Sequence, residues 1–360
     1  MRKRFYLFIA MAVLIILCGA VMWKVLQGSG TEQFIIRHMT NENGTLATYR
    51  LKSDKQGTDV ATGREALSES AGLWLRYALD TDNQEIFDAH MKVIQNYFLD
   101  SSHIVLWKIA ESGKRQARTN ALIDDLRIVQ QLYRAYEKYE EERYKHLADQ
   151  ISDAILHYNK KGSFYVDYYA ADAHVSNDTL TISYVNPKAF SYMKKYGKIT
   201  DAEYQKVVQF LADYPRNGWA FPKTYEKDGT FTYDKEVNII DQSYVAYYRS
   251  LVDLPSAAYL DFLKKTFKKD GKLYGRYHLE TGEPAVAFES PAAYGITILY
   301  LLEAGERKLA EAMYEEAATF RNKNPFSRYY GGYVTGKDKN THIFDNLLPL
   351  LAETALKNSK

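Results

Sequence analysis

The chain has 360 residues, of which 46% are hydrophobic and 26% charged, so it can bury a sizeable core and is not disordered as a whole. Lys and Arg total 47 against 45 Asp and Glu, a formal net charge of +2 that disfavours nucleic acid as a partner. The single cysteine, Cys18, excludes an internal disulfide and leaves the body of the chain without a Cys-based metal site or nucleophile. The 31 tyrosines are an unusual excess that suits polar grooves and stacking surfaces.

The chain begins with a basic segment, residues 1–4, followed by an apolar run. Residues 5–23 carry no charge, and at about 1.5 Å per residue they span close to the ~30 Å hydrocarbon core of a bilayer. Basic residues before the run predict a cytoplasmic N-terminus and an exported remainder. We therefore expect a transmembrane signal anchor over residues 5–26, a linker over 27–31 and an extracellular domain over 32–360 of a single-pass membrane protein.

A cleaved signal peptide is the alternative interpretation of this segment, and it would yield a secreted protein. The run is long for a signal peptide, although Cys18-Gly19-Ala20 offers a cleavage site. Lipid attachment at Cys18 is disfavoured, because the bulky Leu17 stands directly before it where a small residue is expected.

From residue 31 onward the sequence is dominated by amphipathic helices in pairs. Apolar residues three and four apart predict helices over residues 63–79, 86–98, 117–139 and 142–158. Further pairs begin near residues 187, 239 and 291, a last helix covers 343–356, and a short helix over 32–39 would complete the set. Six helical hairpins predict an all-α (α/α)6 toroid. An open solenoid is the alternative, but it usually shows a regular repeat, and none is recognisable here.

Two stretches have strand character instead. Residues 162–186 contain β-prone runs at 164–169 and 180–184, and residues 225–233 form a hairpin pattern around Asp228-Gly229. These stretches are expected to be β-hairpin insertions between the helices. Inserted loops at one end of a toroid usually carry its functional site.

Carboxylates are the candidate catalytic groups, because the sequence has no metal-ligand spacing, GxSxG elbow or phosphate-binding loop. Glu69 lies among small residues in the first predicted helix, and these leave room for a ligand, although a solvated glutamate would look the same. Asp125 lies on an apolar helix stripe, where it needs a ligand, a loop to cap or an Arg partner. Asp241 leans inward at a helix start, which it could instead cap. If these helix starts converge, one acid can protonate a leaving oxygen while another activates water.

These residues and their order resemble glycoside hydrolase family 8, which includes bacterial endoglucanases of cellulose and exopolysaccharide systems. The resemblance extends from about residue 60 to 300. S-E-S-A-G at 68–72 is similar to the family's S-E-G-Q-G without its Gln, and I-D-D-L at 123–126 is similar to D-A-D-L without its first Asp. I-S-Y-V-N-P at 182–187 is similar to P-S-Y-F-x-P. I-D-Q-S-Y at 240–244 is similar to Y-D-A-x-R, with Tyr244 in place of the Arg.

The resemblance implies an inverting endo-glycoside hydrolase without metal or cofactor, with Glu69 as general acid and Asp241 as general base. Asp125 would bind the sugar at the cleavage point. Glu289, just before Pro291, is the second choice for the base. Aromatic side chains would line the sugar groove, namely Tyr184, Trp74, Trp107, Trp219, Tyr244 and Tyr294. Most helix-interior aromatics are expected to be core.

The expected substrate is a bacterial polysaccharide, either a β-1,4-glucan-like chain or an exopolysaccharide. The expected partners are the membrane, through the N-terminal helix, and an exopolysaccharide synthesis machinery. Two alternatives stay open. One is an (α/α)6 hydrolase of another glycan class, such as α-mannans or uronic-acid oligosaccharides. The other is a catalytically inactive glycan-binding subunit, an interpretation that the missing family Gln and Arg keep open.

Overall fold

A computed structural model describes residues 29–53, 60–116, 118–162, 164–215, 217–334 and 337–359. The predicted anchor over residues 5–26 lies outside the described residues. Within them, no helix combines the length and the apolar composition that crossing a bilayer requires.

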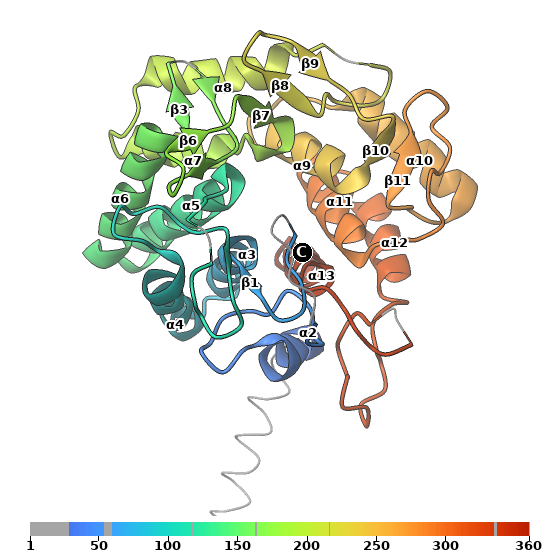
Figure 1. The fold of residues 1–360 in the computed structure, drawn as a ribbon. Coiled ribbons are helices and arrows are strands. Elements are labelled where there is room, and N and C mark those ends of the chain that lie inside the picture. The colour runs from blue at the N-terminus through green and yellow to red at the C-terminus, as the bar shows by residue number, and fades with distance from the viewer. Residues whose placement is uncertain are drawn as a thin grey trace, which may run out of the picture.

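Six helices stand side by side in an inner ring (Figure 1). They are α3 (Ser68–Asp80), α5 (Leu122–Tyr139), α7 (Pro187–Lys195), α9 (Ile239–Ser250), α11 (Pro291–Glu303) and α13 (Phe344–Asn358). Each packs against the next, and α13 packs against α3, so the ring is closed. The closed ring confirms the predicted helical toroid over the solenoid.

The outer layer consists of the helices that follow each inner helix in the chain. They are α4 (Gln84–Val93), α6 (Glu142–Tyr158), α8 (Asp201–Asp213), α10 (Ala257–Asp270) and α12 (Arg307–Ala317). The sixth position is filled by α2 (Gly30–Phe34), which continues into the π-helix η1 (Ile35–Met39) and packs against α13. A second π-helical turn, η2 (Ile94–Phe98), extends α4.

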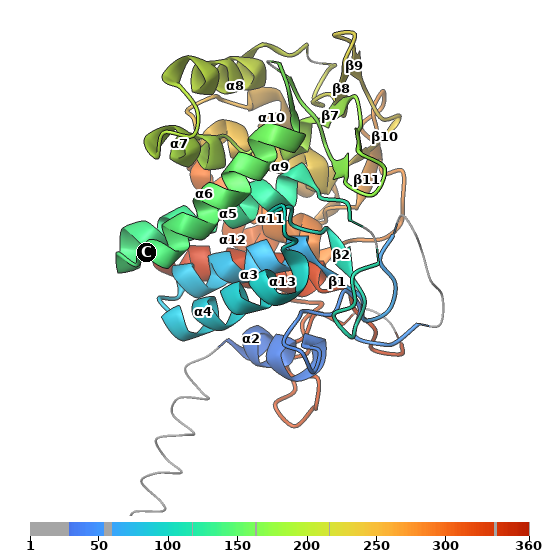
Figure 2. The same ribbon diagram turned by 60° about the vertical axis from the view of Figure 1, so that its left-hand side comes forward.

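Short antiparallel strands gather at one end of the toroid (Figure 2). The two-stranded pairs are β1 (Ala66–Leu67) with β2 (Lys108–Ile109), β3 (Lys160–Lys161) with β4 (Phe164–Tyr165), β5 (Tyr169–Ala170) with β6 (Val175–Ser176), and β10 (Glu236–Asn238) with β11 (Arg276–His278). A three-stranded sheet has the order β7 (Thr179–Thr181), β8 (Thr224–Glu226) and β9 (Phe231–Thr232). The predicted hairpin between β8 and β9 is confirmed, and Gly229 takes the positive φ of +89° in its turn.

Two inner helices begin about one turn later than the sequence pattern predicts. The residues before α3 form β1, which pairs with β2, and Ala121 before α5 has an extended backbone. Likewise, β7 ends early and passes into the 3-10 turn η3 (Ile182–Tyr184). Because β1 leads directly into α3 and β10 into α9, the first turns of both helices lie at the strand-bearing end.

The closest helix contact in the inner ring depends on Gly295 of α11. A Cβ atom at this position would lie 2.4 Å from the backbone carbonyl carbon of Leu348 and 2.7 Å from the nitrogen of Pro349. Both are backbone atoms of α13, so no side-chain rotation can relieve the clash.

We therefore predict that Gly295→Ala lowers the free energy of unfolding by about 1–3 kcal/mol, although Ala is intrinsically the better helix former by about 1 kcal/mol. Urea unfolding followed by circular dichroism measures the change. Lys265→Ala, at an exposed position of α10, is the control and should change the free energy of unfolding by less than about 0.5 kcal/mol. Equal stability of Gly295→Ala and the wild type would contradict this account of the α11–α13 contact.

Candidate active site

Glu69 lies in the first turn of α3 and pairs with a buried arginine of the neighbouring inner helix. Nη1 of Arg127 donates to Oε1 of Glu69 at 3.0 Å and to Oδ1 of Asp124 at 3.2 Å. The Arg127 side chain is only 5% exposed, whereas that of Glu69 is 27% exposed. One carboxylate oxygen of Glu69 is thus held by a buried cation, while the rest of the side chain remains partly exposed to solvent. Glu69 is not the freely solvated glutamate that the sequence alone allowed.

Gly72 explains how α3 and α5 come close enough for this contact. A Cβ atom at Gly72 would lie 3.0 Å from Cβ of Arg127. We expected the small residues around Glu69 to leave room for a ligand. That expectation was wrong for Gly72, which is buried and makes room for α5.

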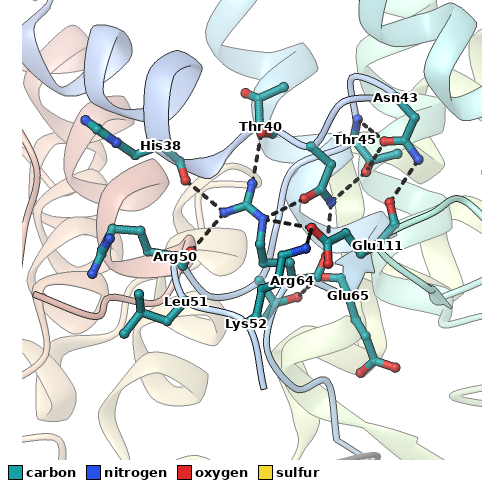
Figure 3. Close-up of polar contacts among 12 residues, drawn as sticks. His38, Thr40, Asn43, Thr45, Arg50, Leu51, Lys52, Arg64, Glu65 and Glu111 are labelled. Carbon is teal, nitrogen blue, oxygen red and sulfur yellow. Dashed lines mark hydrogen bonds and ion pairs between the residues drawn. The ribbon is translucent and has the colours of Figure 1, made fainter. Parts of the chain in front are cut away.

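The segment that leads into α3 is held by Arg64 (Figure 3). Its guanidinium donates at 2.9–3.0 Å to three backbone carbonyls and one amide oxygen, those of His38, Thr40, Arg50 and Asn41. It also pairs with Glu111 at 3.4 Å. Arg64 therefore connects the N-terminal segment, the β2 loop and the strand before Glu69.

Asp124 is the carboxylate that stands beside Glu69. It accepts a hydrogen bond from Oγ of Ser68 at 2.8 Å in addition to the contact with Arg127. Burial, and next the negative charge of Glu69, raise the pKa of Asp124 to about 7, although Arg127 and Ser68 act in the opposite direction. One guanidinium cannot fully compensate two adjacent carboxylates, and Asp124 retains a proton up to near neutral pH.

Asp125, predicted to bind sugar, is instead buried in the first turn of α5. It is 2% exposed, and its Oδ2 accepts from Nδ2 of Asn120 at 2.7 Å. Asn120 also bonds Asn159 and the backbone of Tyr169, so Asp125 holds a loop. Burial raises the pKa of Asp125 well above its usual range. This position argues against a direct sugar contact and matches the loop-capping alternative.

Asp241 lies in the first turn of α9 and carries its own partners. Its Oδ1 accepts from Oγ of Ser183 at 3.2 Å, and its Oδ2 forms an ion pair with Lys223. The helix is capped by Asn238, whose Oδ1 accepts from the backbone of Ile240, so Asp241 is not the cap. Its carboxylate is therefore available at the strand-bearing end of the ring.

Tyr184, in the turn η3, has a largely buried hydroxyl close to site carboxylates. Burial raises the pKa of its hydroxyl, and so do the negative charges of Asp167, Asp124, Glu69 and Asp241. The turn η3, which carries Tyr184, packs against α5 and α9, the helices of Asp124 and Asp241. Asp167 is itself a buried group, with a pKa that burial raises to about 6 against two hydrogen bonds from Thr181. Tyr184 therefore lies between two helices that carry site carboxylates, and its contact with a sugar stays a prediction.

The other predicted aromatic contacts divide into buried and partly exposed side chains. Trp74 is 5% exposed and stacks on Tyr77, and Tyr294 is fully buried. Tyr244 is also buried, under the guanidinium of Arg127 at 4.7 Å from its ring centroid. Their burial argues against direct sugar contact, because these rings offer no free face.

Trp107 and Trp219 remain partly exposed. The carbonyl of Trp107 accepts from the backbone N–H of Ser68 at 3.0 Å, so this tryptophan lies next to Glu69. Trp219 has one face covered by Phe262, at 3.8 Å between ring centroids. Trp107 stays the stronger candidate for stacking on a sugar.

Glu289, the second choice for the base, is engaged elsewhere. It accepts from the hydroxyl of Tyr294 at 2.6 Å and pairs with Lys272 at 3.1 Å. The Glu289 side chain is also less exposed than that of Asp241, at 10% against 22%. These contacts favour Asp241 over Glu289.

Sequence reasoning missed four residues of this site: Arg127, Asp124, Lys223 and His342. His342 precedes α13, and its Nδ1 accepts from the backbone N–H of Phe344 at 3.0 Å, which leaves the proton of the neutral ring on Nε2. Burial lowers the pKa of His342, while the charges of Asp345 and Glu69 act in the opposite direction. The Asp124/Arg127 spacing of three, which places both on one helix face, was the one available signal.

Comparison with known proteins places this toroid in a family. The family "Glycosyl hydrolases family 8" matches residues 2–251. The chain is 37% identical over 329 residues to the Bacillus subtilis (strain 168) protein named "Putative lipoprotein YdaJ", covering 91% of this chain and 86% of that protein. The chain therefore belongs to glycosyl hydrolase family 8 and is a glycosidase.

Two solved structures share the fold. One is described as a novel alpha-amylase from Clostridium perfringens, with a TM-score of 0.82 and 23% identity over 91% of this chain and 98% of that chain. The other is the family 8 endoglucanase Cel10 from Klebsiella pneumoniae, with a TM-score of 0.63 and 17% identity over 92% and 99% of the two chains. At these identities the similarity establishes the architecture.

The raised pKa of Asp124 predicts how stability depends on pH. Because the folded pKa of about 7 exceeds the unfolded value of about 3.9, the contribution of Asp124 is fully present below pH ~4 and is lost as pH rises through ~7. Asp124→Asn should therefore reduce the loss of unfolding free energy between pH 5 and pH 8 by at least about 1 kcal/mol, measured by urea unfolding at both values.

Asp149→Asn is the matched control. Burial acts to raise the pKa of Asp149, but the contact with Lys145 lowers it, and the net effect is a lowered pKa. Asp149 therefore titrates below this pH window. The control should keep the wild-type difference between pH 5 and pH 8. The same behaviour in Asp124→Asn would show that Asp124 does not retain a proton.

Proposed function

We propose that this glycosidase is an inverting endo-hydrolase of a bacterial polysaccharide, with Glu69 as general acid and Asp241 as general base. The observation that carries the proposal is the position of Tyr184 in η3, which packs against both α5, the helix of Arg127 and Asp124, and α9, the helix of Asp241. Each carboxylate has its own cationic partner, Arg127 for Glu69 and Lys223 for Asp241. Two separate carboxylates facing one region are what an inverting mechanism requires, since a water must fit between the base and the sugar.

In the proposed reaction, Glu69 protonates the glycosidic oxygen while Asp241 takes a proton from water on the opposite face of the sugar. Asp124 shares the Arg127 guanidinium with Glu69, so only part of that positive charge is left to stabilise the anion of the acid. Lys223 and Ser183 hold Asp241 in position. Tyr184 lies beside the reacting sugar, and Trp107 provides a partly exposed ring near Glu69 on which a neighbouring sugar can stack.

The polysaccharide is proposed to be a glucan or an exopolysaccharide without a high negative charge. The near-neutral chain gives no general attraction for polyanions.

Substitution of the two carboxylates tests the mechanism. Glu69→Gln and Asp241→Asn should each lower kcat by about 10²–10⁴-fold, because each removes one proton-transfer group. Reducing-sugar release from a panel of α- and β-glucans measures the activity, and NMR of the first product should show the inverted anomer. Glu289→Gln should keep its activity within about threefold, since Glu289 is already paired.

Other outcomes identify the alternatives. Loss of activity in Glu289→Gln but not in Asp241→Asn would transfer the role of base to Glu289. A wild-type protein that binds glycans without hydrolysing any of them would support the inactive binding subunit.

We further propose that the domain is exported and stays attached to the membrane through residues 5–26. The name of the Bacillus relative supports attachment to a membrane and favours lipid attachment at Cys18 as the alternative to an anchor. Either attachment would bring the catalytic domain close to a polysaccharide synthesis machinery at the cell surface.

Cys18→Ser distinguishes these modes of attachment. With a transmembrane anchor, the variant should remain in the membrane fraction with the wild-type mass, and Leu14→Arg should prevent insertion because a charge in the apolar run costs about 2.5–3.5 kcal/mol. Membrane fractionation and intact-mass measurement read out the result. Fatty-acid labelling of the wild type that Cys18→Ser abolishes would establish the lipoprotein instead.

A further inference from the structure

A cavity of about 650 Å³ lies away from the catalytic carboxylates. It is enclosed by α8, the β3–β4 pair, β7, β8 and the adjoining parts of α5 and α7, and neither Glu69 nor Asp241 lines it. Figure 1 places β3, α7 and α8 beside one another on the side of the ring opposite α13. Its volume falls within the ~300–1,000 Å³ typical of small-molecule sites.

The interior of this cavity is apolar and largely aromatic. Its lining includes Leu122, Phe164, Phe190, Val207, Phe210 and Tyr225. Leu122, Phe190 and Val207 are buried, so they form the floor. These three side chains have no hydrogen-bonding groups. They suit a hydrocarbon chain better than a sugar, whose hydroxyls would lose their partners on entry.

One polar group of the lining is unsatisfied. Tyr165 is only 9% exposed, and its hydroxyl has no hydrogen-bond partner among the described residues. Tyr165 and Glu203 of α8 both line the cavity, and burial, followed by the charge of Glu203, raises the pKa of this hydroxyl. A buried hydroxyl without a partner is unfavourable, so an acceptor on a bound ligand would stabilise it.

Lysines form the opening of the cavity. Lys160, Lys161, Lys206 and Lys227 line it together with a single carboxylate, Glu203. Glu203 pairs with Lys160, while Lys161 and Lys227 share Asp178. Lys206 is exposed and makes no ion pair within the described parts of the chain. The opening therefore has a positive charge left for an anion.

We propose that this cavity binds a single-chain amphipathic anion, with its alkyl chain on the aromatic floor and its carboxylate between Lys206 and the Tyr165 hydroxyl. Lys206 and Glu203 are three residues apart on one face of α8, and both line the cavity together with Tyr165. The site is separate from the catalytic carboxylates and does not depend on the proposed reaction. Charge complementarity and the unsatisfied hydroxyl both select an anionic head group over a neutral one.

Photo-crosslinking with a diazirine-labelled decanoate tests the proposal. The full chain is held in phosphatidylcholine nanodiscs, and mass spectrometry locates the label. Label should concentrate in peptides that contain Tyr165 or Val207, and the matching diazirine decanol should label them at least about fivefold less, because it lacks the charge. Lys206→Glu should reduce decanoate labelling about fivefold, and Val207→Trp, which fills the floor, should reduce it to background.

Lys265→Glu on α10 is the matched control, since it reverses the charge of another exposed lysine on an outer helix without an ion pair among the described residues. It should leave the labelling unchanged. If Val207→Trp fails to fold, Lys206→Glu at its exposed position still decides the question. The proposal is overturned by equal labelling with decanol, by label found only elsewhere, or by displacement with tri-galacturonate but not with unlabelled decanoate, which would identify an anionic glycan site.

Discussion

The guanidinium of Arg127 is the contact on which the proposed active site depends. It comes from α5, pairs with Glu69 of α3 and Asp124 of its own helix, and lies over the ring of Tyr244 from α9. A buried arginine is stable only when its charge is compensated, and removal of either partner would leave an expensive unpaired charge. The same requirement brings three inner helices to a common point at the strand-bearing end, so the packing of the ring and the chemistry of the site share one constraint.

Burial accounts for most of the protonation at this end of the ring. It is the main cause of the raised pKa values of Asp124 and Asp167, and the negative charge of Glu69 adds to the effect on Asp124. The cations at this end are Arg127, which pairs with Glu69 and Asp124, and Lys223, which pairs with Asp241. A buried carboxyl without full compensation by a cation is stabilised by binding a proton.

Local patterns predicted most of the fold and part of the site. Helical periodicity found the inner and outer helices, but the late starts of α3 and α5 depend on partners distant in sequence, such as β2 for β1. Among the site residues, the resemblance selected Asp125, whereas Asp124 faces Glu69. Neighbouring residues on a helix point about 100° apart, so a one-residue difference in assignment moves a side chain from the site into the loop below. Lys223 and His342 come from segments that only the closed ring brings near the carboxylates.

The position of Arg127 also bears on the departures from the family motifs. The resemblance places an arginine three residues after the base, and this chain has Tyr244 there. That absence was one reason to keep a catalytically inactive alternative. A guanidinium nevertheless reaches this place, because Arg127 packs on the Tyr244 ring from α5. Arg127 thus places a positive charge next to the proposed acid and above the ring of Tyr244. The missing arginine on α9 does not leave this end of the ring without a guanidinium, and it is therefore a weak argument against catalysis.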